Sequence, residues 1–250
     1  MNLLHSIIVG IVQGLTEFLP ISSSAHLALL EQAFRIQDKL QFTVLLHLGS
    51  LIALLVAMRI EIKEILLSIF CKHEFNLLLC LIIGSIPAGI IGILFKGKVE
   101  LAFETPTIIA ICLVITGIIL WLTRSIRVQK PKPLTLFKAF IIGIAQAVSI
   151  LPGISRSGTT IATGIYLGLK RSESAKFSFL LAIIAILGAS ILEIKPSTFS
   201  LPLFSIFGLI VSFIASYIAI KLLLKVVKTR FFALFSLYCW ALGFIILRFG

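Results

Sequence analysis

Apolar runs of about twenty residues recur along this chain, and short clusters of charged residues separate them. An α-helix needs about 20 residues to cross a hydrocarbon core about 30 Å thick. We therefore expect an all-α polytopic membrane protein that forms a single integral membrane domain over residues 1–250. Only 13% of the residues are charged, about half the share that a soluble domain uses to cover its surface. Six runs predict simple spanning helices, at residues 42–58, 77–95, 107–123, 177–194, 203–220 and 231–249.

The net charge of +12 does not indicate a nucleic-acid partner. Basic surfaces that bind nucleic acid lie on soluble faces, whereas the Lys and Arg residues here flank apolar runs, where they determine topology. Membrane lipids are therefore the expected surroundings, and we expect no nucleic acid to bind.

Two further apolar regions, residues 2–30 and 136–169, each contain a Pro- and Ser-rich interruption. Each flank of an interruption is too short to span a membrane alone, so both regions are predicted to be re-entrant helix hairpins. Irregular backbone at that depth is tolerated only where it is buried in protein or lines a wet cavity. The interruptions therefore mark the expected position of a site.

The two interrupted regions resemble each other. Corresponding broken segments are typical of duplicated halves in membrane proteins. We therefore predict an inverted-topology repeat with residues 1–123 as the first half and residues 136–250 as the second. One constant offset pairs Gly10 with Gly143, Ile11 with Ile144, Gln13 with Gln146, Ile21 with Ile154, Ser22 with Ser155 and Ser24 with Ser157.

Loop charges orient the predicted spans. Three simple spans lie between the hairpins, and an odd number of crossings inverts the second half relative to the first. Of the 22 Lys and Arg residues, fifteen fall in the predicted loops of one side and six in those of the other. The first side has loops 59–76, 124–138, 170–176 and 221–230, and the second has loops 31–41, 96–106, 195–202 and 248–250. The positive-inside rule makes the first side cytoplasmic. Both termini and the mouth of the first hairpin then face outside, and the two hairpin tips meet near the midplane.

Glu17 and Arg156 carry the charges of the two interruptions. A charge in the hydrocarbon region costs roughly 2.5–3.5 kcal/mol on insertion scales, and such residues commonly mark a functional site. The alternative is that the two residues neutralise each other as a structural ion pair.

The residues after each interruption, "SSSAHLALLEQAF" and "SRSGTTIATGIYLGL", are typical of Ser-capped helix starts. Helix N-termini bind phosphate, and the arginine fork donates bidentate hydrogen bonds to it, so the pair predicts a site for a doubly phosphorylated anion. Ser23 and His26 lie on one face of the first helix, as an activated nucleophile or a water and its base would. Glu17 is placed to hold a divalent cation or to act on a proton. His47 either lines the cavity or packs in the core.

The segments "QGLTEFLPISSSAH" and "LPGISRSGTT" resemble the two signature motifs of the bacterial undecaprenyl-diphosphate phosphatase family, the bacitracin-resistance type. The resemblance covers essentially the whole chain. The matched positions are Gln13, Glu17, Pro20, Ser22, Ser23 and His26 in the first motif and Pro152, Gly153, Ser155, Arg156, Ser157 and Thr160 in the second.

The resemblance implies removal of the terminal phosphate of undecaprenyl diphosphate, which gives undecaprenyl phosphate and inorganic phosphate. This reaction recycles the lipid carrier for cell-wall synthesis and confers bacitracin resistance. The resemblance also implies a divalent cation, Mg²⁺ or Ca²⁺, with Glu17 as its ligand, and a site open to the periplasmic side of the bacterial inner membrane; a homodimer is left open. Carried over residue by residue, the implied catalytic set is Glu17, Ser23, His26 and Arg156, and the implied phosphate-binding set is Gln13, Ser22, Ser155, Ser157 and Thr160.

Gln13 stands where many family members have glutamate. Glutamine can act neither as a base nor as an anionic metal ligand, so Glu17 is expected to carry any carboxylate role alone. Whether Ser23, His26 or a water attacks phosphorus stays open. The alternative function is a transporter that moves a polyprenyl phosphate lipid, because inverted repeats with broken helices are typical of transporters. A hydroxyl, an imidazole and a carboxylate at one site favour hydrolysis.

Overall fold

A computed structural model describes residues 2–34, 36, 39–70, 75–193 and 203–249, and all the regular secondary structure in this part of the chain is helical. Five of its helices are long and apolar enough to cross a membrane, or six if a bent pair counts as one span. The predicted all-α, multi-pass membrane fold is confirmed in these terms. The five spans are α5 (Phe75–Leu94), α7 (Pro106–Leu122) extended by a 3₁₀ turn to Ser125, α10 (Arg171–Glu193), α11 (Leu203–Val226), and the segment Arg230–Phe249, in which a 3₁₀ turn leads into α12 (Phe235–Phe249).

The bent pair consists of α3 (Lys39–Ala57) and α4 (Arg59–Phe70), which meet at an angle of 70°. Residues 59–76 are predicted to form a loop, but Arg59–Phe70 is helical, because Ile62 and Ile65 pack against the main core. Another expected loop contains α6 (Lys96–Phe103). Residues 35, 37–38, 71–74, 195–202 and 250 of the expected loops lie outside the described part.

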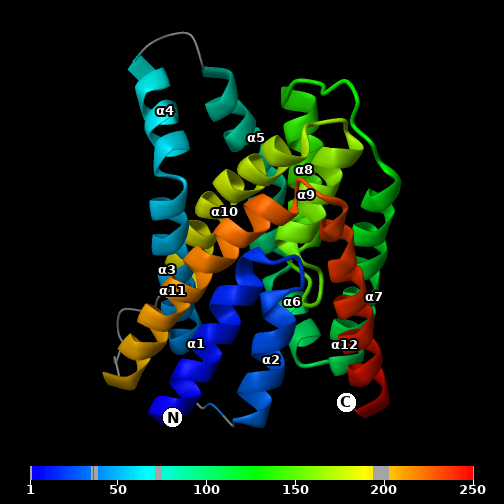
Figure 1. Ribbon diagram of the computed structural model, residues 1–250. Coiled ribbons are helices and arrows are strands. Elements are labelled where there is room, and N and C mark those ends of the chain that lie inside the picture. The colour runs from blue at the N-terminus through cyan, green and yellow to red at the C-terminus, as the bar shows by residue number, and fades with distance from the viewer. Residues whose placement is uncertain (1, 35, 37–38, 71–74, 194–202, 250) are drawn as a thin grey trace.

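The two interrupted regions fold as helix hairpins, as predicted. The first consists of α1 (Leu3–Phe18) and α2 (Ser23–Ala33), and the second of α8 (Leu136–Val148) and α9 (Arg156–Tyr166). At 1.5 Å per residue, even α1 is only about 24 Å long, short of the 30 Å hydrocarbon core. The hairpins enter from opposite ends of the molecule and their tips meet near its middle (Figure 1).

Each hairpin packs its first helix against a helix from the other half of the chain, α1 on α11 and α8 on α5. Glycines bring these helices close: a side chain at Gly10 would meet the backbone of Gly208, and one at Gly143 would meet that of Gly84. Small residues permit such close approach in membrane proteins. Positions 10 and 143 are partners in the predicted repeat, so the two packings correspond as duplicated halves would. The repeat itself stays a prediction.

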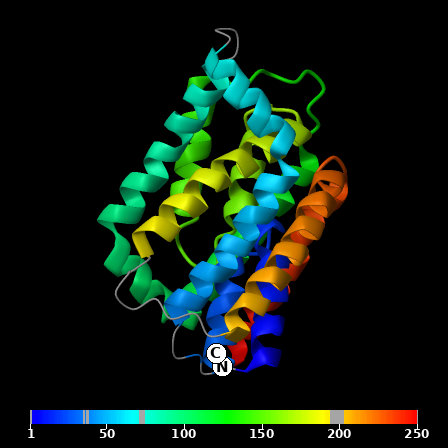
Figure 2. The same cartoon turned by 90° about the vertical axis from the view of Figure 1, so that its left-hand side faces the viewer.

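The helix α10 joins the two halves across the middle of the protein. It contacts α3 on one side and α5 on the other, and Figure 2 shows it crossing between them. Phe179 of α10 packs edge-on against Phe18 of the first hairpin, with ring centroids 5.6 Å apart. The main core therefore closes around the hairpin tips and holds them together.

Candidate active site

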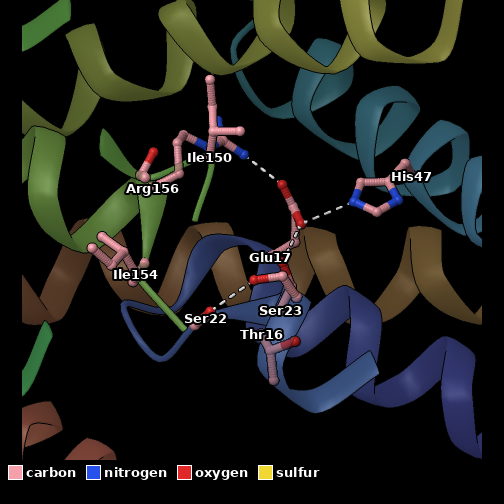
Figure 3. A pocket seen from close by; sticks show the side chains of 11 residues that line it. Thr16, Glu17, Ser22, Ser23, His47, Ile150, Ile154 and Arg156 are labelled. Carbon is pink, nitrogen blue, oxygen red and sulfur yellow. Dashed lines mark hydrogen bonds and ion pairs between the residues drawn. The ribbon is translucent and has the colours of Figure 1, made fainter. Parts of the chain in front are cut away.

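A cavity of about 120 Å³ lies where the two hairpin tips meet α3. The N-termini of α2 and α9 both reach it (Figure 3). Of the predicted site residues, Gln13, His26, Ser157 and Thr160 are not among its lining. The side chains that line it are Thr16, Glu17, Ser22, Ser23, Ser24, His47, Ser149, Ile150, Ile154, Ser155 and Arg156.

Glu17 is the residue on which the site converges. Its carboxylate is buried. Arg156, which belongs to the second hairpin, donates from Nη2 to Glu17 Oε1 at a distance of 2.5 Å. On the other oxygen, Oε2, Ser23 Oγ donates at 2.7 Å and Gln13 Nε2 at 3.0 Å. A buried charge is tolerated when it is paired and hydrogen-bonded. The structure therefore brings Glu17, Ser23 and Arg156 together, as the predicted site requires.

His47 belongs to the site, although its position in an apolar run left two explanations open. Its Nε2 lies 3.5 Å from Glu17 Oε2, and its Nδ1 lies 2.8 Å from the carbonyl oxygen of Thr43. The ring lines the cavity and faces Glu17 from the side opposite Arg156 (Figure 3). The cavity explanation is therefore the right one for His47.

The backbone turns sharply at Ser22, the N-cap of α2. Ser22 is the one non-glycine residue with a positive φ (66°) in the described chain. Its hydroxyl makes no cap hydrogen bond and lies instead 3.0 Å from Ser24 Oγ. The expected serine cap is therefore not formed on α2, because this backbone conformation turns the side chain away from the free N–H groups.

His26 does not pair with Ser23. Its Nδ1 lies 2.8 Å from the carbonyl oxygen of Ser22, and its Nε2 lies 2.7 Å from the hydroxyl of Tyr238 on α12. The predicted hydroxyl–imidazole pair is thus absent from the described hydrogen bonds, although both residues lie in the first turn of α2. Tyr238 has no sequence motif around it, so only tertiary structure shows its place here.

The second motif mainly builds the turn that carries Arg156. Ser155 caps α9 as predicted, because its Oγ accepts from the N–H of Gly158 at 3.2 Å. Ser157 donates to the carbonyl oxygen of Leu19 at 3.3 Å and so links the two tips. Thr160 turns toward α10, where its hydroxyl lies 2.6 Å from that of Ser178. Ser157 and Thr160 therefore stabilise the site from behind, outside the cavity lining.

A divalent cation fits this site only in part. Within the described residues, no three His, Cys, Asp or Glu side chains are grouped as metal ligands, and Glu17 is the sole carboxylate in the cavity lining. The Oε1 of Gln13 is buried without a partner one turn away. Carbonyl and carboxylate oxygens suit Mg²⁺ and Ca²⁺, and Mg²⁺ is often bound by one or two carboxylates plus substrate phosphates. The donor set fits a cation held largely by a phosphorylated substrate.

The chain is similar to known proteins over a length that includes every residue of the site. The family model described as bacitracin resistance protein BacA matches residues 6–245. A protein of Methanobrevibacter smithii is 41% identical over 269 residues, which cover 98% of this chain and 97% of the relative. One from Carboxydothermus hydrogenoformans is 42% identical over 258 residues (99% and 97%), and one from Korarchaeum cryptofilum is 39% identical over 261 residues (99% and 99%). Each of the three is named undecaprenyl-diphosphatase.

Proposed function

Since the chain belongs to the bacitracin resistance protein BacA family, we infer that it is an undecaprenyl-diphosphatase. It hydrolyses undecaprenyl diphosphate to undecaprenyl phosphate and inorganic phosphate, and so returns the lipid carrier to cell-wall synthesis. The names of the relatives favour this enzyme over the alternative of a lipid transporter.

The observation that carries the proposal is the convergence of a carboxylate, a hydroxyl and a guanidinium on one cavity. A transporter of phosphorylated lipids needs cations and helix dipoles but no group that accepts a proton from a nucleophile. Here Ser23 donates to Glu17 at 2.7 Å, so this carboxylate is already in place to take a proton. Arg156 and the N-termini of α2 and α9 supply the positive charge for a diphosphate.

The reaction follows from these positions. A water beside Ser23 forms a bond to the terminal phosphorus while Glu17 accepts its proton, which gives inorganic phosphate directly. If the Ser23 oxygen attacks in its place, the phosphoryl group is transferred to Ser23, and a water then hydrolyses this phosphoserine to release inorganic phosphate and restore the hydroxyl. The bond from that phosphorus to the bridging oxygen breaks, and the electron pair leaves with the lipid monophosphate. Arg156 stabilises the charge that develops on the phosphoryl oxygens. The hydroxyls of Ser22 and Ser155 line the same cavity and orient the phosphates.

The proposed cofactor is Mg²⁺ or Ca²⁺, with Glu17 as its protein ligand and Gln13 Oε1 as a neutral oxygen donor. When bound, such a cation neutralises charge on phosphate oxygens.

We further propose that the protein lies in the bacterial inner membrane with the cavity open to the periplasmic side. The basic segments 124–138, 170–176 and 221–230, which are expected on the cytoplasmic side, lie toward the end opposite both termini, and this supports the orientation (Figure 1).

Phosphate release by the purified protein tests the function directly. Wild type, Glu17→Gln and Arg156→Ala are compared on a C55 or C15 diphosphate, each with Mg²⁺ or Ca²⁺ and with chelator. We expect both variants to lose at least about 100-fold in kcat, the scale of a lost acid–base or electrostatic group, and chelator to stop the wild type.

Matched controls are Glu64→Gln and Arg127→Ala, which change exposed residues outside the site and should leave kcat unchanged. A folded wild type that binds the lipid and releases no phosphate would contradict the enzyme and favour the transporter. Full activity in chelator would remove the cation from the proposal.

A further inference from the structure

The hydrogen bonds of His26 indicate a role different from that of a catalyst. Both ring nitrogens are engaged, and neither faces Glu17, Ser23 or Arg156. A backbone carbonyl can only accept, so Nδ1 carries a hydrogen and donates it to Ser22 O. In the neutral ring Nε2 is then the unprotonated nitrogen, and the hydroxyl of Tyr238 donates to it. The nitrogen that would attack phosphorus or take a proton is therefore covered by Tyr238.

The carbonyl that His26 holds belongs to the most unusual peptide of the site. Ser22 adopts φ 66° and ψ 95°, and such backbone persists only when its surroundings over-determine it. Two donors reach its oxygen, the ring of His26 at 2.8 Å and the N–H of His26 at 3.5 Å. Ser24 Oγ, which lies near the Ser22 hydroxyl, accepts from Gly153 N at 3.4 Å. Each of these contacts holds the turn in place.

This turn determines where Ser23 points. Ser23 begins α2 directly after Ser22, and its hydroxyl reaches Glu17 from there. If the Ser22 peptide relaxed, the Ser23 hydroxyl would move relative to Glu17 and the cavity. Misplacement of a reacting group by about 1 Å can cost about 100-fold in rate.

We propose that His26 and Tyr238 are positioning residues that clamp the Ser22 turn, so that Ser23 faces Glu17, and that His26 is neither nucleophile nor base. Tyr238 lies on α12, stacks on the His26 ring with centroids 5.6 Å apart, and donates to its Nε2, so that the ring stays in place with Nδ1 toward Ser22 O. The last helix of the chain thereby sets the geometry of the first motif. The proposal rests on the phosphatase function inferred above.

Substitutions of His26 separate positioning from catalysis. Asparagine can place an N–H near the position of Nδ1 and donate to Ser22 O, but it has no basic or nucleophilic nitrogen. Glutamine can reach the position of Nε2 without supplying that donor. We expect His26→Ala and His26→Gln to lose about 100-fold in kcat, whereas His26→Asn stays within about tenfold of wild type.

Tyr238→Phe tests the second member of the clamp. Loss of one hydrogen bond predicts a decrease in kcat of about three- to tenfold with KM unchanged, because the cavity itself is intact. Tyr217→Phe is the matched control and should have wild-type kcat, since Tyr217 lies on the surface of α11 with Lys221 over its ring. Thermal unfolding of each variant in detergent checks that it is folded.

The outcomes separate the two proposals. Phosphate release by wild type together with an asparagine variant as inactive as alanine would overturn the clamp and make His26 a catalyst. A Tyr238→Phe variant as active as wild type, or more active, would also overturn it, because freeing Nε2 would then cost nothing. No phosphate release by wild type would overturn the phosphatase function instead.

Discussion

Glu17 connects both halves of the chain at the scale of a single residue. It accepts from Gln13 and Ser23 of its own hairpin and from Arg156, 139 positions away. Its side chain is 7% exposed and that of Arg156 is 15% exposed. Because both charges are buried, removing one of them destabilises the protein more than breaking a surface ion pair would. The ion pair is thus both a part of the site and a support for the contact between the hairpin tips.

A double substitution separates these two roles. Removing one partner of a buried pair leaves an unpaired charge, which costs about 3–5 kcal/mol, so Arg156→Ala should lower Tm in detergent. Adding Glu17→Gln should recover much of that Tm, because the orphaned charge is gone, but should not recover phosphate release. If stability and activity returned together, the pair would be structural alone.

The helices that carry the site are positioned by close backbone contacts at glycine. In the packing of α8 on α5, a Cβ at Gly143 would lie against the carbonyl oxygen of Gly84. Gly89, on the same α5, has open space where its side chain would be. The contact is thus specific to the face that holds the second hairpin.

Gly143→Ala is therefore expected to push the second hairpin away from α5. Overpacking costs about 1–3 kcal/mol, and each kcal/mol lowers Tm by about 2–4 °C in a chain of this size. Thermal unfolding in detergent measures the effect. Gly89→Ala adds the same methyl group to open space, so it should not lower Tm. Equal losses in the two variants would argue that helix packing at Gly143 is unimportant.

Element boundaries show where sequence patterns are reliable. The long apolar runs and the two interruptions predicted the helices and hairpins, because length and hydropathy are local properties that the bilayer selects. The charged segments after α3 and α5 are predicted to be loops, yet they contain α4 and α6. Their helicity comes from packing and from pairs such as Glu61 with Lys176, which residue types alone do not reveal.

Both termini lie at one end of the whole molecule, and the Lys- and Arg-rich segments 124–138, 170–176 and 221–230 lie toward the other, which is called the basic end below (Figures 1 and 2). The proposed orientation places the basic end in the cytoplasm, which single cysteines can test. The free cysteines of the described part are buried, namely Cys80, Cys112 and Cys239. With Cys71 replaced by alanine, new cysteines at exposed loop positions can be labelled one at a time.

We expect Glu104→Cys to react with a membrane-impermeant thiol reagent in intact cells. Lys130→Cys, in the basic loop before α8, should react only after the membrane is permeabilised. Both positions are exposed, so the comparison reports on the side of the membrane and not on burial. The reverse labelling pattern would contradict the proposed orientation and would place the mouth of the first hairpin on the cytoplasmic side.

The sequence by itself determined the membrane class, the two broken hairpins and the meeting of their polar tips. The membrane class and the hairpins follow from residue types in short stretches, namely apolar length, serine after proline, and a charge where lipid should be. The meeting of the tips follows from the odd number of spans between the two hairpins. It also led to Glu17, Ser23 and Arg156 as members of one site.

Only the tertiary structure decided which groups touch. It placed His47 beside Glu17 and turned Thr160 away from the cavity. It also showed that His26 forms hydrogen bonds with Ser22 and Tyr238 and not with Ser23. The contact of His26 with Tyr238 joins residues 212 positions apart. Such contacts depend on how helices from both halves pack and on a strained turn at Ser22. Neither is encoded in a local pattern, so a motif identifies the residues of this site but not their partners.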